Sequence, residues 1–178
     1  AAEGGRTVMR TVFMGTPDFA VPVLEALLAG AHDIVAVYTR PDRHVGRGRR
    51  VLPTPVKRFA LERGLPVLQP ASLRGEEIAR EMEGLNPEVV VVAAYGRIIP
   101  EAMLRVPAHG MVNVHPSLLP RHRGPSPVAT AILEGASVTG VTIMLLDAGM
   151  DSGPILAQRE AAVQPGERTG ELTTRLFG

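Results

Sequence analysis

Short apolar runs alternate with segments of helical spacing along this chain. The runs with strand character lie at 11–14, 34–38, 66–68, 89–93 and 110–114. Apolar positions recur at helical spacing in segments at 17–29, 55–63, 75–83, 100–105, 126–133 and 169–177. Such alternation favours parallel strands joined by right-handed crossovers. It predicts an α/β fold: a Rossmann-like, open, twisted and mostly parallel sheet with helices on both faces.

Individual segments refine this prediction. Segment 89–93, Val-Val-Val-Val-Ala, has the composition of a strand buried on both faces of a parallel sheet. Segments 138–146 and 155–163 have no helix between them, so we expect them to pair antiparallel at the sheet edge. Thr16, before Pro17, is expected to cap the first helix. Residues 1–8 carry no pattern and are interpreted as a tag or disordered tail before a single domain at 9–178.

Composition removes several classes of chemistry. Apolar residues make up 45% of the 178 residues and aromatic residues only 3%, so the core must be aliphatic. The chain has no Cys, which excludes disulfides, thiolate nucleophiles and cysteine-bound metal. Lys57 is its only Lys, which makes a lysine Schiff base improbable. No apolar run reaches the roughly 20 residues that span a bilayer, and no secretory signal opens the chain, so we expect a cytoplasmic protein without a membrane partner.

Positive charge is concentrated between Arg40 and Arg50. That stretch holds five Arg and one Asp, a charge of +4 within a chain whose net charge is +1. A basic island on a mildly acidic body predicts a local anionic partner.

Candidate chemistry gathers after the predicted strands, where open α/β sheets bind ligands. The first such loop, Gly15-Thr16-Pro17, lacks the G-x-G-x-x-G spacing of a dinucleotide site. Asn113 and His115 project to one face, because residues two apart in a strand lie about 6.6 Å apart on the same side. An amide beside an imidazole suits oxyanion stabilisation with proton transfer, although the same pattern fits a hydrogen-bonded structural His. The spacing of His115 to His109 and His122 matches no common metal site, so no metal is expected.

A second polar loop contains Asp147 and Asp151 among glycines. These aspartates could serve catalysis or form an Asx turn, and spacing alone does not say which of them matters.

Several motifs together resemble a known family. Segments 113–120 (Asn-Val-His-Pro-Ser-Leu-Leu-Pro), 123–124, 140–143 and 150–154 are similar to the shared core of the 10-formyltetrahydrofolate-dependent formyltransferases. Segments 13–20, 39–43, 46–50 and 53–57 resemble one family among them, the methionyl-tRNA formyltransferases. The likeness runs from about residue 10 to residue 177. That family carries a further carboxy-terminal β-barrel domain, which is expected to be absent from this chain.

The resemblance implies a formyl transfer from 10-formyltetrahydrofolate to initiator methionyl-tRNA. Its implied catalytic residues are Asn113 and His115, which would bind the oxyanion, and Asp151, which would hold a charged His115 and order a proton-carrying water. The folate site implied by the family comprises Ser117, Leu118, Leu119, Pro120, Tyr95, Gly96, Arg97, Ile98, Ile99 and Asp147. The residues implied to contact tRNA are Arg43, Arg47, Arg49 and Arg50, although an ordinary solvated loop is the alternative for this stretch. We expect a monomer.

Other functions stay open at this point. A formyltetrahydrofolate hydrolase or a sugar-amine formyltransferase would share the same core. A tRNA-binding module without catalysis would have no need of the Asn113, His115 and Asp151 set. An NAD-dependent oxidoreductase is disfavoured by the missing glycine fingerprint.

Overall fold

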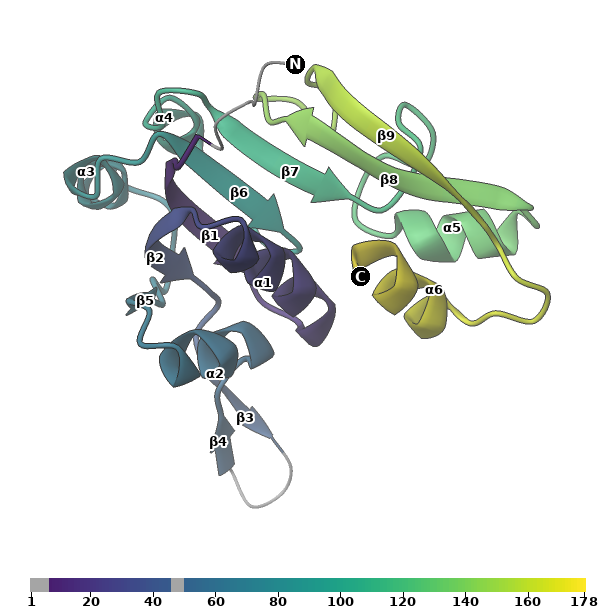
Figure 1. Ribbon diagram of the computed structural model, residues 1–178, viewed down its shortest axis with the longest axis horizontal. Coiled ribbons are helices and arrows are strands. Elements are labelled where there is room, and N and C mark those ends of the chain that lie inside the picture. Colours follow the sequence, from purple (N-terminus) through teal and green to yellow (C-terminus); the bar gives the residue numbers. More distant parts are fainter. Residues whose placement is uncertain (1–6, 46–49) are drawn as a thin grey trace, which may run out of the picture.

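A seven-stranded sheet organises the computed structural model, which describes residues 7–45 and 50–178 (Figure 1). The strand order is β5-β2-β1-β6-β7-β8-β9. The strands are β1 (Arg10–Gly15), β2 (Asp33–Tyr38), β5 (Val67–Leu68), β6 (Val89–Ala93), β7 (Met111–His115), β8 (Val138–Leu145) and β9 (Ile155–Ala162). The first five in that order pair in parallel, whereas β8 pairs antiparallel to both β7 and β9. The predicted α/β sheet and its antiparallel edge pair are both confirmed.

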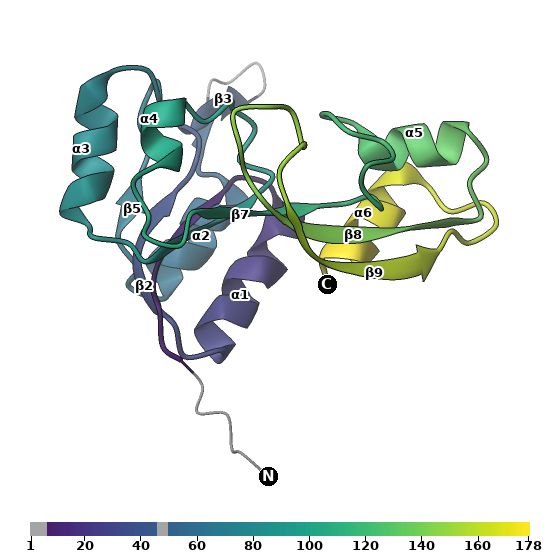
Figure 2. The same ribbon diagram turned by 90° about the horizontal axis from the view of Figure 1, so that it is seen from above.

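Helices cover both faces of the sheet (Figure 2). Helices α3 (Glu76–Gly84) and α4 (Glu101–Leu104) pack on one face. The other face carries α1 (Val21–Ala29), α2 (Pro55–Glu62) and α6 (Thr169–Phe177), and α5 (Pro127–Leu133) packs against α6. Among the described residues, no helix combines the length and the apolar character needed to cross a membrane.

Alternating side chains of the central strands build the aliphatic core. In β1, Val12 and Met14 face the cluster under α3 and α4, whereas Phe13 faces the cluster under α1 and α2. In β6, Val90 and Val91 divide in the same way, and every residue of that strand is at most 9% exposed. The period of two therefore holds even where both faces are apolar.

The start of the first helix differs from the prediction. Thr16 does not cap it: its hydroxyl donates to the backbone oxygen of Tyr95 at 2.9 Å instead. A short 3-10 helix, η1 (Asp18–Ala20), precedes α1, which has no side-chain cap. The hydroxyl is drawn away because the loop after β6 lies beside the loop after β1 in the parallel sheet.

The arginine-rich stretch is also corrected, from a loop to a hairpin. Strands β3 (Arg43–Val45) and β4 (Arg50–Leu52) pair antiparallel, with His44 opposite Val51. The density of arginines concealed the short β-compatible runs that flank the glycines.

Candidate active site

A buried imidazole and a carboxylate meet at the carboxyl end of β7. Nδ1 of His115 lies 3.7 Å from Oδ1 of Asp151, and their side chains are 6% and 14% exposed. His115 is the last residue of β7, whereas Asp151 lies in the loop between β8 and β9. The structure therefore brings together two of the three residues that the resemblance implies to be catalytic.

The second imidazole nitrogen already has a partner. Nε2 of His115 lies 3.1 Å from the backbone oxygen of His122. A carbonyl oxygen only accepts, so Nε2 must carry a proton and donate. Nδ1, which faces Asp151, is left as the nitrogen that can meet a substrate.

Backbone geometry aims Asp151 at the imidazole. Its other oxygen, Oδ2, accepts a hydrogen bond from the Gly124 backbone nitrogen at 2.9 Å. Asp151 has a φ of 49° and Gly124 a φ of 93°, both in the left-handed region, where Asp is tolerated and Gly is unstrained. A Cβ at Gly124 would lie 3.5 Å from Sδ of Met150, which places the loops at 116–126 and 146–154 side by side.

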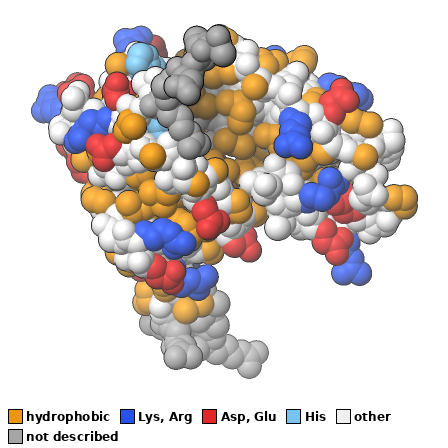
Figure 3. Space-filling view, viewed as in Figure 1, with side chains coloured by type: hydrophobic (Ala, Val, Ile, Leu, Met, Phe, Trp, Pro, Cys, Tyr) orange, Lys and Arg blue, Asp and Glu red, His pale blue; other side chains and the backbone are white. Residues whose placement is uncertain are grey.

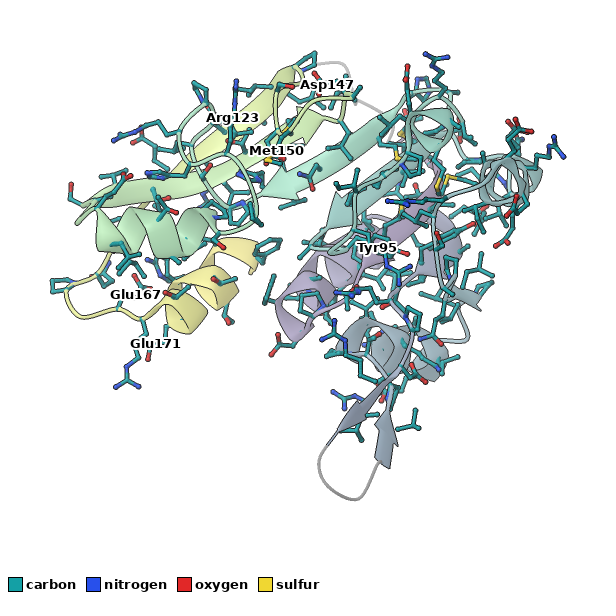
Figure 4. All side chains as sticks on the ribbon, turned by 180° about the vertical axis from the view of Figure 1, so that it is seen from behind. Tyr95, Arg123, Asp147, Met150, Glu167 and Glu171 are labelled. Atoms are coloured by element: carbon teal, nitrogen blue, oxygen red, sulfur yellow. The ribbon has the colours of Figure 1, made fainter. Side chains whose placement is uncertain are left out.

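The two aspartates of the loop after β8 make different contacts. Asp147 accepts from the Gly149 backbone nitrogen at 2.9 Å and from the Ser152 hydroxyl at 2.9 Å, so it closes its own loop as an Asx turn. Asp151 reaches out of the loop to His115. Figure 4 shows Asp147 near Met150 and Arg123 at the same end of the sheet.

Asn113 lies on the same face of β7 as His115. Its strand neighbours are Val92 on β6 and Met144 on β8. It is half-buried, and across residues 7–45 and 50–178 no hydrogen bond engages its side chain. The amide is therefore available to a ligand at the end of β7.

The segment after β7 is anchored to the antiparallel strands. Thr142 of β8 donates to the Ser117 backbone oxygen at 2.7 Å and accepts from the Leu119 backbone nitrogen at 3.1 Å. Gln158 of β9 donates to the Leu119 oxygen at 2.8 Å. Gly140 leaves room for this segment, because a Cβ there would lie 2.6 Å from Cδ2 of Leu118.

These anchors limit what the implied folate residues could offer a ligand. Ser117 is fully buried and its hydroxyl donates to the Arg121 backbone oxygen at 2.7 Å, while Leu119 is 5% exposed. Leu118 is half-buried and Pro120 exposed. Side-chain contacts from this segment would therefore come from Leu118 and Pro120.

The loop after β6 contributes side chains of contrasting exposure. Tyr95 is 1% exposed, and burial raises the pKa of its phenol, while the charges of Arg97 and Arg40 act in the opposite direction. Arg97 donates to the Pro70 backbone oxygen at 2.9 Å. Gly96 has a φ of 82°, in the left-handed region.

The two isoleucines of the same loop differ in exposure. Ile99 packs on the core under α3 and α4, whereas Ile98 is 90% exposed. Because β6 and β7 are parallel neighbours, this loop lies beside the end of β7.

The arginines implied to contact tRNA are placed only in part. Arg43 lies on β3 and is exposed, and Arg50 begins β4. Arg47 and Arg49 lie outside the described residues.

Two of the three histidines considered as metal ligands, His115 and His122, have other partners. Nε2 of His122 lies 2.8 Å from a carboxylate oxygen of Glu134, and its backbone oxygen accepts from His115. In the part of the chain that the structure describes, no group of three or more His, Asp or Glu side chains is arranged to hold a metal.

Two hollows among the described residues are lined by none of the three residues Asn113, His115 and Asp151. One, of about 410 Å³, is lined by segment 68–72 and by α3. The other, of about 620 Å³, lies between β8, β9 and the end of α6. The surface in Figure 3 shows hydrophobic side chains gathered in a hollowed area near its centre. The groups that could carry chemistry are instead gathered around His115.

Sequence reasoning missed two contributors, the His122 carbonyl and the Gly124 amide. Both act through backbone atoms, which every residue type possesses. Only the Arg123-Gly124 pair within the family motif signalled this turn.

Comparisons with known proteins identify the family of the chain. A family model described as formyl transferase matches residues 9–177. The methionyl-tRNA formyltransferase of Chloroflexus aggregans is 57% identical over 169 residues, which cover 95% of this chain and 55% of that protein. The enzyme of the same name from Marinobacter nauticus is 50% identical over 168 residues, covering 94% of this chain and 54% of that one. The chain thus spans about half the length of these curated relatives.

Solved structures of enzymes with other names share the fold. Glycinamide ribonucleotide transformylase 1 from Geobacillus kaustophilus superposes with a TM-score of 0.75 at 28% identity, covering 95% of this chain and 91% of that one. A formyltetrahydrofolate deformylase from Pseudomonas syringae has a TM-score of 0.76 at 21% identity, covers 96% of this chain and 58% of that one, and supports the fold alone. With its family match extending over residues 9–177 and its sheet shared with these enzymes, the chain belongs to the formyl transferase family.

Proposed function

We propose that this chain transfers a formyl group from 10-formyltetrahydrofolate to the α-amino group of methionyl-tRNA. The observation that carries the proposal is the contact between the buried imidazole of His115 and Asp151 at the end of β7. Relatives at 50–57% identity bear the name methionyl-tRNA formyltransferase, which supports this acceptor over a sugar amine or water.

The reaction needs one anion stabilised and one proton moved. The amine nitrogen attacks the formyl carbon, the carbonyl oxygen becomes an oxyanion, and the bond from carbon to N10 of the folate then breaks. The amine loses a proton and N10 gains one, so no net proton is consumed. No covalent bond to the protein forms.

His115 and Asn113 would stabilise the oxyanion. The Nδ1 proton of His115 is the donor left over once Nε2 is engaged by the His122 carbonyl. The free amide of Asn113 lies on the same face of β7 and supplies a second donor. Donors held in place before the reaction avoid the cost of reorienting solvent as charge develops.

Asp151 would act on charge and on the proton. It lies 3.7 Å from the imidazole, too far for a direct hydrogen bond but close enough for its negative charge to act on the ring. Its carboxylate would accept the proton of the attacking amine through an ordered water. The Gly124 amide holds it in place for this role.

The donor and acceptor would approach from two sides. The folate donor would lie against the loop at 95–99 and the segment 117–120, with Leu118, Pro120 and the exposed Ile98 as apolar contacts. The acceptor RNA would be contacted by the β3–β4 hairpin, where Arg43 is exposed. Arginines bind phosphates bidentately and stack on unpaired bases.

A single-turnover assay tests the proposal. The chain is held in excess over labelled methionyl-tRNA, so that weak RNA binding does not hide the chemistry, and 10-formyltetrahydrofolate is added. We expect N-formylmethionyl-tRNA to appear and uncharged tRNA to give no formylated product. Donor consumption that is equally fast without methionyl-tRNA would instead identify a hydrolase and overturn the proposed acceptor.

A further inference from the structure

The arginine hairpin has little apolar support of its own. Strands β3 and β4 pair with each other and project from the rest of the molecule (Figure 1). Val51 and Leu52 of β4 are 53% and 51% exposed, so they do not anchor it in the core. The direction of the hairpin must therefore be set by the residues at its base.

An ion pair holds the residue that precedes the first strand of the hairpin. Asp42 directly precedes β3, and its Oδ2 lies 2.6 Å from Nζ of Lys57 on α2. Oδ1 accepts a hydrogen bond from Nε2 of Gln69 at 2.6 Å. The Lys57 and Asp42 side chains are only 21% and 22% exposed, so this pair is screened less than the surface pairs of the chain.

Buried hydroxyl groups hold the residues that follow the second strand of the hairpin. Thr54, which follows β4, has its hydroxyl 2.7 Å from the hydroxyl of Thr39, and both residues are buried. The Thr54 hydroxyl also accepts from the Lys57 backbone nitrogen at 3.1 Å, which caps α2. Gln69 additionally donates to the Arg40 backbone oxygen at 2.9 Å. The start of the hairpin is thus tied to α2 and to Gln69 after β5, and its end is tied to Thr39 and to the start of α2.

The position of Lys57 makes its role specific. It lies in the first turn of α2, where the positive end of the helix dipole disfavours a cation. The one lysine of the sequence therefore lies where helix electrostatics oppose it. Asp42 offsets this repulsion, so the charge serves the contact with the hairpin base rather than the helix.

We propose that Asp42, Lys57 and Gln69 form a clamp that fixes the direction of the β3–β4 hairpin and thereby positions the exposed Arg43 for contact with the acceptor RNA. These are positioning residues, since they would touch neither the donor nor the reacting atoms. The RNA part of this inference rests on the proposed function.

Charge variants test the clamp. Asp42→Asn and Lys57→Gln each break the pair, the exchanged variant Asp42→Lys/Lys57→Asp restores opposite charges, and Gln69→Ala is a milder change that leaves the pair intact. Asp33→Asn is the matched control, because it removes the exposed pair of Arg10 and Asp33 far from the hairpin. Hydrogen exchange of amides 43–45 and 50–52 reports on the hairpin, and kcat and KM for methionyl-tRNA report on its use.

We expect the single charge variants to speed hairpin exchange and raise KM for methionyl-tRNA about tenfold with kcat within threefold. The exchanged variant should recover part of both changes. The clamp would be overturned if the single charge variants left amide hydrogen exchange of the hairpin unchanged. It would also be overturned if they sped that exchange but left KM for methionyl-tRNA unchanged. If the unaltered chain formylates no methionyl-tRNA, the proposed function fails instead, and hydrogen exchange alone decides whether the clamp holds the hairpin.

Discussion

Asp147 and Asp151 share one loop but have opposite roles in it: Asp147 bonds within the loop, and Asp151 leaves it to face His115. Local hydrogen bonding satisfies the first carboxylate completely. The second is held by a backbone amide of another loop and keeps one oxygen directed at the imidazole. The proposed chemistry therefore depends on which of the two carboxylates points away from its own loop and toward His115.

Replacement of Asp151 by Asn should abolish most of the transfer. The amide keeps the shape of the side chain but loses the negative charge beside the imidazole and the site that accepts the amine proton. We expect kcat to fall at least about a hundredfold with a small change in KM for the folate. A steady-state assay of formyl transfer measures the change in kcat, and Glu76→Gln, at an exposed position, is the control. A turnover close to that of the unaltered chain would remove Asp151 from the mechanism.

His115 and Asp151 should behave as one unit. We expect His115→Ala to cost at least about a hundredfold in kcat and Asn113→Ala a similar factor, since each removes an oxyanion donor. Because Asp151 acts partly through the imidazole, the double variant His115→Ala/Asp151→Asn should lose less kcat than the product of the two single losses. Multiplying losses in this double variant would show that the two residues act independently.

Gly140→Ala should destabilise the segment that carries Leu118. A Cβ at this position would lie 2.2 Å from the Arg159 backbone oxygen, and backbone of a paired strand cannot move away cheaply. We expect a loss of about 1–3 kcal/mol in the free energy of unfolding, measured by urea denaturation. Gly84→Ala in α3 is the control, because no atom lies within 4 Å of its added Cβ. Equal effects of the two substitutions would contradict the packing argument.

The Asp42 carboxylate should make stability depend on pH. Hydrogen bonds from Lys57 and Gln69 hold the pKa of Asp42 below its usual value. A depressed pKa means that the folded state favours the charged form, so the contribution is fully present above about pH 4 and is lost as pH falls below it. Asp42→Asn should lower the free energy of unfolding more at pH 7 than at pH 3. A difference that is the same at both pH values would show that the charge contributes nothing.

Arg43→Ala should weaken the use of RNA without touching the chemistry. One phosphate contact fewer should raise KM for methionyl-tRNA and reduce the slope of log affinity against log salt concentration by about one. Arg80→Ala is the matched control, since Arg80 is exposed on α3 and pairs with Glu76. Kinetics that stay the same at every salt concentration would argue against the hairpin as the RNA contact.

The sequence by itself determined the order and kind of the elements. Apolar periodicity is a local property, so the five parallel strands, the helices between them and the antiparallel pair at 138–146 and 155–163 could be predicted from it. The motif at 113–120 likewise placed Asn113 and His115 on one face of a strand end. The Arg-rich hairpin was missed because charge concealed its short strands.

Only the tertiary structure decided which distant groups meet. Asp147 and Asp151 are equivalent by spacing; the family resemblance named Asp151, and the path of the loop after β8 is what brings it to His115. The His122 carbonyl and the Gly124 amide that complete the site are backbone atoms, which carry no signature in residue type. Contacts between loops depend on how strands are ordered across the sheet, and that order is set by the packing of the whole chain.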